Sequence, residues 1–348
     1  ALAAALGLAL PAAAQDHVKI GVLNDQTGLY AEFGGMGSVE ATKMAIEDFG
    51  GKALGKPIEI LSVDHQNKPD IAAATARKWY DADGVTAIAD LTNSAVALAV
   101  QAIAKERGKV ALFSGPATTR LTNEDCSPTG FHWVFDTYSQ AYGTARAVLA
   151  EKGDTWFLLV ANYAFGHQMA KDLETIVTTG GGKVLGNVRH PISNADFSSF
   201  LLTAQASKAD VIALANGGQD TITAIKQAAE FGITGSRQSL VPIVLFINDV
   251  HALGLKTAQG LTLTEGFYWN RDAKTRAWSR RFFERAKKMP SMAHAGVYSS
   301  VLNYLKAVEK TGTDDATTVM QQLKSADIDD GLFKGRIRAD GKFAHDML

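Results

Sequence analysis

The sequence predicts an α/β protein built from two doubly wound parallel-sheet lobes. The 348 residues are too many for one ordinary hydrophobic core. From residue 17 onward, short runs rich in β-branched residues alternate with amphipathic stretches of helical length. This alternation occurs in two successive series and shows no fixed sequence period, which argues against a solenoid.

The first series predicts one lobe. Its first helix places Val39, Met44 and Ile46 at helical spacing and ends at Gly50. The expected strands cover residues 17–23, 57–63, 85–89 and 109–114, and the expected helices cover 37–49, 70–81 and 94–107.

The second series follows a polar loop at 118–130 and predicts the other lobe. Its expected strands cover 155–161, 182–188, 210–215 and 242–247, and its helices 140–152, 166–179, 197–206 and 220–231. The rest of the chain predicts a strand-like segment at 262–269, helices at 275–288, 295–311 and 315–325, and a hairpin within 331–344.

The N-terminal residues have the pattern of a secretory signal. Residues 1–15 are apolar, are too short to span a bilayer, and end in Ala12, Ala13 and Ala14 before Gln15. We expect residues 1–15 to be the remnant of a signal peptide and the exported protein to begin near Gln15 or Asp16. No later run is long and apolar enough to span a membrane, so direct membrane insertion is not expected.

Composition narrows the classes of partner. Hydrophobic residues make up 46% and charged residues 20%, as in a packed globular protein, and the formal net charge is -1. Because there is no basic excess, we expect neither nucleic acid nor an anionic membrane surface as a partner.

Ligands of open parallel sheets bind beyond the carboxyl ends of the strands, so the loops that leave the strands are the candidate site. In the first lobe, Tyr30 and Phe33 are candidate aromatic walls, with core packing as the alternative. Residues with small hydroxyl and amide side chains follow the ends of the next strands. There the N-terminus of a helix would favour a bound anion. They are Thr92, Asn93, Ser94, Ser114 and Thr118. For Asn93 and Ser94 the alternative is ordinary helix capping.

The second lobe offers further candidates in the corresponding loops. Phe165 is placed to face a ligand, and Asn216 and Gly217 offer amide and backbone groups. Asp249 is a candidate partner for a cation or hydroxyl, with capping of the following turn as the alternative.

Motifs for catalysis and metal binding are missing from the sequence. There is no G-x-S-x-G, H-E-x-x-H, C-x-x-C or Walker sequence, and the glycines at 34–37 lack dinucleotide-loop spacing. The histidines show no metal-ligand spacing, and Cys126 is the single cysteine, expected in packing. We therefore expect no catalytic residue, metal or cofactor, and a protein that is not an enzyme.

Four segments carry a resemblance to a known family: KIGVLNDQTGLYAEFGG, GVTAIADLTNSAVALAV, KVALFSGPATTRLT and ANYAFGHQMAKDL. From about Val18 onward the chain resembles the periplasmic solute-binding proteins of the branched-chain amino acid transporter family, the receptors of ATP-driven (ABC) importers. The resemblance implies a type I periplasmic binding protein fold, with two lobes joined by a three-strand hinge that closes on the ligand. Lobe 1 would comprise 16–138 and 267–325, and lobe 2 would comprise 139–266 and 326–348. It also implies a periplasmic protein that delivers its ligand to a membrane permease. We expect the protein to be a monomer, although the sequence does not determine its oligomeric state.

The resemblance also assigns roles in the site. It implies that the ligand's carboxylate is held at Asn93, Ser94, Ser114, Ala117 and Thr118. Phe33 matches the family's aromatic residue before the first-loop glycine. Phe165 stands where amino-acid binders usually have tyrosine, and their acidic partner for the ligand's ammonium falls near Asn248 and Asp249.

These departures bear on the ligand, because a buried ammonium group needs an acceptor. The sequence is most similar to the subgroup that binds aromatic carboxylates such as hydroxybenzoates and hydroxycinnamates. A branched-chain or other hydrophobic amino acid is the alternative ligand. A cleft hydrolase or amidase and a ligand sensor are the alternatives from other classes of function.

Overall fold

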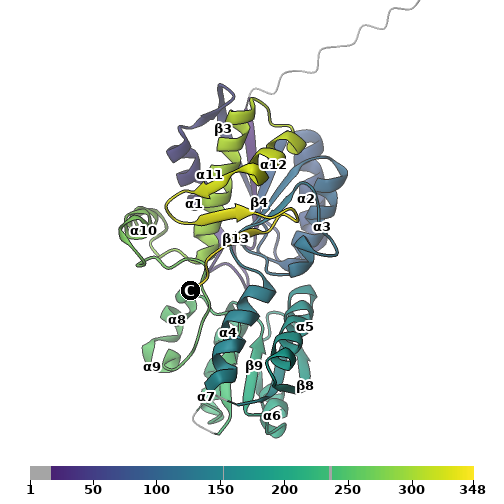
Figure 1. Cartoon of the computed structure of the whole chain (residues 1–348), viewed down its shortest axis with the longest axis vertical. Helices are drawn as coiled ribbons and strands as arrows, with labels where there is room; N and C mark the ends of the chain where they lie inside the picture. Colours follow the sequence, from purple (N-terminus) through teal and green to yellow (C-terminus); the bar gives the residue numbers. More distant parts are fainter. Residues whose placement is uncertain (1–16, 152, 235–236) are drawn as a thin grey trace, which may run out of the picture.

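The computed structural model describes residues 17–151, 153–234 and 237–348. The expected signal-peptide remnant lies outside these residues. The described chain forms an α/β structure with two parallel sheets, one above the other in Figure 1, as the sequence predicts. We call the six-stranded sheet with its covering helices lobe 1, and the four-stranded sheet with its helices lobe 2.

The lobe 1 sheet has the strand order β2-β3-β1-β4-β5-β6 and is parallel except for the β2–β3 pair. Every residue of β4 is buried, as expected for a central strand covered on both faces. The strands are β1 (Val18–Asn24), β2 (Lys52–Ala53), β3 (Lys56–Asp64), β4 (Val85–Asp90), β5 (Val110–Phe113) and β6 (Gly130–His132).

Helices cover both faces of this sheet. The long helix α11 packs against α1, and α2 packs against α3. The helices are α1 (Gly35–Phe49), α2 (Pro69–Lys78), α3 (Ser94–Glu106), α10 (Ala273–Ala286), α11 (Met292–Thr311) and α12 (Ala316–Ser325). A π-helical turn (Trp79–Asp83) follows α2, and a 3-10 turn (Thr119–Thr122) follows β5. Helix α1 ends where sequence predicted, because Gly50 takes a left-handed conformation at φ 109°.

The lobe 2 sheet has the order β10-β9-β7-β8 and is fully parallel. Its strands are β7 (Thr155–Ala161), β8 (Lys183–His190), β9 (Val211–Ala215) and β10 (Ser239–Pro242). Its helices are α4 (Thr137–Glu151), α5 (Ala164–Thr179), α6 (Ser198–Ala206), α7 (Gln219–Glu230), α8 (Ile247–Leu253) and α9 (Leu255–Ala258).

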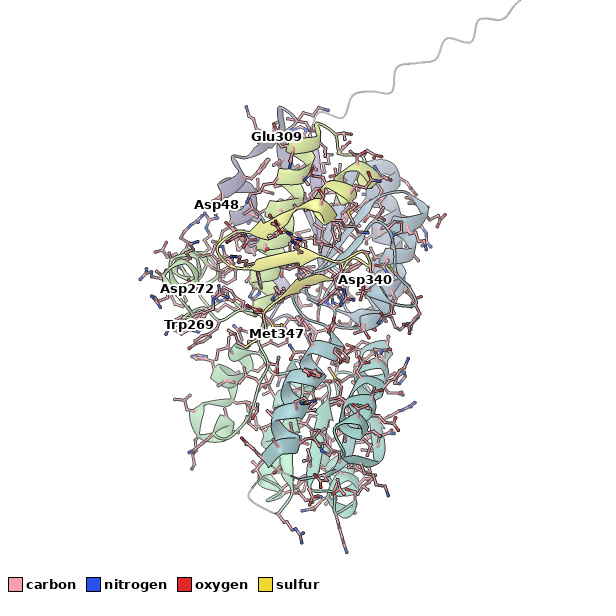
Figure 2. All side chains as sticks on the ribbon, viewed as in Figure 1. Asp48, Trp269, Asp272, Glu309, Asp340 and Met347 are labelled. Carbon is pink, nitrogen blue, oxygen red and sulfur yellow. The ribbon has the colours of Figure 1, made fainter. Side chains whose placement is uncertain are left out.

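Three segments lie side by side where the lobes meet. The backbone of Glu265 exchanges two hydrogen bonds with Leu348, at 2.9 and 2.7 Å. A ring nitrogen of His345 contacts the carbonyl oxygen of Val134. The C-terminus and Met347 accordingly lie between the lobes (Figures 1 and 2). The segments contributed by residues near 134, 265 and 347 form the hinge region.

The structure differs from expectation in three places. The strand expected at 242–247 lies earlier in the chain, since β10 covers Ser239–Pro242 and α8 begins at Ile247. The strand-like segment 262–269 forms no strand and instead crosses between the lobes.

The third difference concerns the C-terminal segment, which we expected in lobe 2. Its strands β11 (Asp327–Asp329), β12 (Lys334–Ile337) and β13 (Phe343–His345) form a separate antiparallel sheet on lobe 1 (Figure 1). The cause is aromatic packing, because Phe343 stacks on Trp133 with ring centroids 4.7 Å apart. The other expected lobe boundaries stay predictions.

Candidate ligand-binding site

A narrow cavity with about 20 Å³ of free internal space lies between the lobes, where the carboxyl ends of both sheets meet. Both lobes contribute to its lining. The lining residues are Tyr30, Phe33, Thr92, Ser94, Gly115, Ala117, Phe135, Tyr163, Phe165, Gly217, Val244 and Phe246. Most of these side chains are apolar, as in typical sites for small organic ligands.

Aromatic rings from both lobes make the walls of the cavity. Phe33 of lobe 1 stacks on Phe246 at a centroid distance of 4.4 Å and an angle of 19°. Phe135 meets the same Phe246 edge-on at 5.5 Å. Tyr163 and Phe165 form a tilted pair at 5.9 Å. Stacked and edge-on arrangements are favourable for aromatic pairs, so the rings that line the cavity also stabilise one another.

Two tyrosine hydroxyls meet across the lobes. The hydroxyl of Tyr30 is hydrogen-bonded to that of Tyr163. Burial raises the pKa of both phenols, so both are neutral. The loop that carries Tyr30 is fixed by Asp25, whose carboxylate accepts the N–H groups of Gly28 at 2.8 Å and Tyr30 at 2.7 Å.

Hydrogen-bond donors gather at the lobe 1 end of the cavity, which we call the anion end. Ser94 is the first residue of α3, where the helix dipole is positive. The backbone N–H groups of Ala117 and Thr118 both donate to Ser94 Oγ, at 3.4 and 3.3 Å. Both bonds are long for an N–H donor. Within the described chain, Ser94 Oγ accepts these two hydrogen bonds without donating its own proton.

A buried carboxyl lies behind this end. Asp90 accepts a hydrogen bond from Asn24 Nδ2 at 2.8 Å, and burial raises its pKa to about 6. A Cβ on Gly115 would come within 2.6 Å of Asp90 Oδ1 and 2.8 Å of Thr92 Cα. Glycine is therefore needed for the loop to pass this close to β4.

The structure brings many of the predicted residues to this cavity. Tyr30, Phe33, Thr92, Ser94, Ala117, Phe165 and Gly217 all line it. Whether they contact a ligand stays a prediction.

Two predicted lobe 1 side chains are engaged elsewhere. Asn93 caps α3, its Oδ1 accepting from the N–H groups of Ala95 and Val96, which is the capping alternative. Ser114 is directed toward α11, where its Oγ lies 3.4 Å from that of Ser300. The small side chains at these strand ends satisfy local backbone and helix contacts first.

Thr118 has a divided role. Its side chain caps the 3-10 turn by accepting the N–H of Arg120 at 3.4 Å, while its own N–H faces Ser94. The backbone, not the hydroxyl, is therefore the group of Thr118 that reaches the anion end.

The polar candidates of lobe 2 are also held away from the cavity lining. Asn216 Oδ1 accepts the hydroxyl of Thr221 at 2.7 Å, and its Nδ2 faces His190. Asp249 Oδ2 accepts the N–H of Phe246 at 2.9 Å and so caps α8. Burial raises the pKa of Asp249 to about 7. Asp249 borders a neighbouring hollow between the lobes together with Glu32 and Asp220 rather than the aromatic cavity.

Sequence reasoning missed three aromatic walls. Tyr163 stands in the same strand-exit loop as Phe165, so that loop did carry a signal. Phe135 lies in a crossing segment, where no strand exit was expected. Phe246 opens the segment that follows the fourth expected strand of lobe 2, but it was not singled out as a site residue, because the strand was expected to run to 247 and ends at Pro242.

The described residues contain no group of three or more His, Cys, Asp or Glu side chains that would hold a metal ion. In the same residues, no helix is long and apolar enough to cross a membrane.

Comparison with known proteins gives the family. The family model described as "Periplasmic binding protein" matches residues 17–348. A crystal structure of a periplasmic binding protein from Burkholderia mallei is 53% identical, with a TM-score of 0.94, and the match covers 95% of this chain and 88% of that one.

Two further structures extend the comparison. A branched chain amino acid ABC transporter periplasmic ligand-binding protein from Burkholderia xenovorans is 40% identical, with a TM-score of 0.83 and coverage of 95% and 88%. An ABC transporter solute binding protein from Rhodopseudomonas palustris, solved with 3,4-dihydroxy benzoic acid, is 21% identical, with a TM-score of 0.86 and coverage of 96% and 92%, and shares the fold. With its two parallel-sheet lobes, its interlobe cavity and a family match along nearly the whole chain, the protein belongs to the periplasmic binding protein family.

Proposed function

We propose that this protein is the periplasmic solute-binding component of an ABC importer and that its ligand is a small aromatic carboxylate of the hydroxybenzoate or hydroxycinnamate type. The observation that carries the proposal is the make-up of the cavity. Aromatic rings form its walls, Ser94 and two backbone N–H groups form one end, and no Asp or Glu is found among its described lining residues.

Charge decides between an aromatic acid and an amino acid. A carboxylate finds hydrogen-bond donors and a helix N-terminus at Ser94. An ammonium group would be buried among rings without a carboxylate, which costs several kcal/mol, on the order of the penalty for an unpaired buried ion. The proposed ligand has a carboxylate group and no ammonium group.

Shape supports the same ligand. The stacked rings at Phe33 and Phe246 favour a flat ligand. Because both lobes line the cavity, a ligand gains its full set of contacts only when the lobes are closed, which is what drives closure. The closed protein would then deliver the ligand to a membrane permease.

A branched-chain or other hydrophobic amino acid is the second candidate. The Burkholderia xenovorans protein, at 40% identity, is described as belonging to a branched chain amino acid transporter. For such a ligand, Asp249 or Glu32 in the adjacent hollow would have to receive the ammonium group.

Hydrolysis is less well supported than binding. The Ser94 hydroxyl is hydrogen-bonded to two amides and, within the described chain, to no histidine or carboxylate that would activate it. Thr92 lies 3.4 Å from His65, yet its oxygen already accepts the N–H of Asp25. These contacts orient the loop rather than generate a nucleophile.

A thermal-shift panel tests the proposal. Benzoate, para-hydroxybenzoate and para-hydroxycinnamate should raise the melting temperature in a concentration-dependent way, while leucine, isoleucine and valine should not. Mass spectrometry should recover the bound acid unchanged. A shift with the amino acids alone would replace the proposal with the second candidate, and recovery of a cleaved product would indicate an enzyme.

A further inference from the structure

A second cavity lies on the flank of the molecule where α10 faces α8 and α9 (Figure 1). Its volume is about 350 Å³, within the range of small-molecule sites. Trp269, which lines it, is seen at this flank near the level where the lobes meet (Figure 2). The lining residues are Glu32, Ile247, Asn248, Val250, His251, Leu255, Tyr268, Trp269, Phe283, Lys287, Lys288 and Met289. We call this the flank cavity.

Large apolar side chains around the flank cavity are exposed to solvent. Tyr268 and Trp269 form a tilted ring pair at 5.5 Å. Leu255 is 84% exposed and Phe283 is 46% exposed. Large apolar groups gathered at a hollow, unlike single exposed ones scattered over a surface, mark a binding site.

The polar groups of the flank cavity favour an anion. Its one carboxylate, Glu32, is already neutralised by Lys288, whose Nζ lies 3.4 Å from it and donates to the Glu32 carbonyl oxygen at 2.7 Å. Lys287 and His251 have no carboxylate partner among the described residues. The cavity therefore combines apolar walls with an uncompensated cation.

A polar acceptor also borders the flank cavity. Asn248 is buried, and within the described chain its Oδ1 has no hydrogen-bond partner. A ligand hydroxyl or N–H that reached it would satisfy this atom.

Both lobes build the flank cavity. Helix α10 packs on α1 of lobe 1, whereas α8 packs on α7 of lobe 2. The two sides are joined by a hydrogen bond from Asn248 Nδ2 to the carbonyl oxygen of Met289, at 2.8 Å. A molecule bound here would contact both lobes and would favour their present arrangement over a more open one.

We propose that the flank cavity is a second binding site, which takes a small aromatic anion against Trp269, Tyr268 and Phe283 with Lys287 as its cation. This inference is independent of the ligand proposed for the cavity between the lobes. Anilinonaphthalene sulfonate, a fluorescent aromatic anion, serves as the probe.

The test is a fluorescence titration of the full chain with this probe. The wild type should show one saturable site. Leu255→Asp adds a negative charge at a solvent-exposed position of the lining and should weaken probe binding at least about 10-fold. Trp269→Ala should weaken it similarly, while the matched control Leu202→Asp, at a half-exposed leucine on α6 of lobe 2, should leave it unchanged.

Three outcomes would overturn the inference. One is an unchanged affinity in Leu255→Asp, and another is an equal loss in Leu202→Asp. The third is an equal loss of probe affinity in Ser94→Ala, which would place the probe in the cavity between the lobes. Leu255 is exposed, so Leu255→Asp should fold and the test remains valid even if Trp269→Ala misfolds. The thermal-shift test with benzoate addresses the cavity between the lobes and is independent of this titration.

Discussion

The hydroxyl of Tyr30, carried by lobe 1, is hydrogen-bonded to the hydroxyl of Tyr163, carried by lobe 2. This bond joins the two sides of the candidate site directly. A contact that exists only with the lobes together contributes to closure and hence to ligand affinity.

Tyr163→Phe removes that bond and keeps the ring. A neutral hydrogen bond contributes about 0.5–1.5 kcal/mol, so affinity for para-hydroxybenzoate should fall about 2- to 10-fold. Isothermal titration calorimetry measures the change, with Tyr138→Phe, at an exposed tyrosine of α4, as the matched control. Equal affinities in wild type and Tyr163→Phe would show that the bond has no part in closure.

Ser94→Ala removes the hydroxyl of the anion end. A hydrogen bond to a charged group contributes about 1.5–3 kcal/mol, so benzoate affinity should fall about 10- to 100-fold. Ser199→Ala, at an exposed position of α6, is the control and should bind as the wild type does. If Ser94→Ala retained full affinity, the carboxylate would have to bind elsewhere.

Two neighbouring glycines should respond differently to alanine. A Cβ on Gly217 would sit at ordinary contact distances of 3.8–3.9 Å from Val244, Phe165 and Tyr30. Gly217→Ala should fold normally and reduce affinity by taking space from the cavity. Gly218 has φ 61°, and a Cβ there would overlap the carbonyl oxygen of Leu29 in the other lobe.

Gly218→Ala should therefore block closure rather than merely crowd the ligand. Small-angle X-ray scattering with saturating para-hydroxybenzoate should show the wild type contracting, while Gly218→Ala stays extended and binds at least about 100-fold more weakly. Contraction of Gly218→Ala to the same radius would contradict the contact assigned to Leu29.

Stability should depend on pH through buried carboxyls. The pKa of Asp249 is raised by burial from 3.8 to about 7, so the folded chain holds this proton more tightly than the unfolded chain. The resulting stabilisation is full at acidic pH and is lost as the pH rises from about 4 to about 7. Asp90 and Asp220, with pKa values raised to about 6 by burial, act in the same direction.

Asp249→Asn isolates this effect. Its unfolding free energy from urea titrations should change less between pH 5 and pH 7.5 than that of the wild type, by on the order of 1 kcal/mol or more. Asp314→Asn, at an exposed carboxylate, should keep the wild-type slope. An unchanged slope in Asp249→Asn would mean that this carboxyl is not protonated in the fold.

Asp136 acts in the opposite sense at lower pH. Burial alone would raise its pKa, but Lys342, 3.3 Å away, and His132 lower it to about 2. Its stabilisation is present above pH 4 and is lost as the pH falls toward 2.

Much of the fold was predictable because parallel sheets have a strong sequence pattern. Fully buried strands appear as largely apolar runs, VTAIAD in β4 and VIALA in β9, and Gly50 marks the end of α1. The short strands and the crossing segments had no such signal. The place of the C-terminal sheet depends on the stacking of Phe343 on Trp133, residues far apart in sequence.

The candidate site was predictable only in part. Strand-exit loops indicated Tyr30, Phe33, Ser94 and Phe165, since topology brings those loops together. Topology does not reveal the direction in which each side chain points. Asn93 therefore caps its helix, and the phenylalanine at 135 reaches the cavity from a hinge segment.

Calorimetric titration of the wild type with para-hydroxybenzoate and with L-leucine, side by side, tests the central claim most directly. The account predicts that the cavity between the lobes binds one molecule of para-hydroxybenzoate. It also predicts that leucine binds at least about 100-fold more weakly, because an unpaired buried ammonium group is costly. Tighter binding of leucine than of the aromatic acid would contradict it.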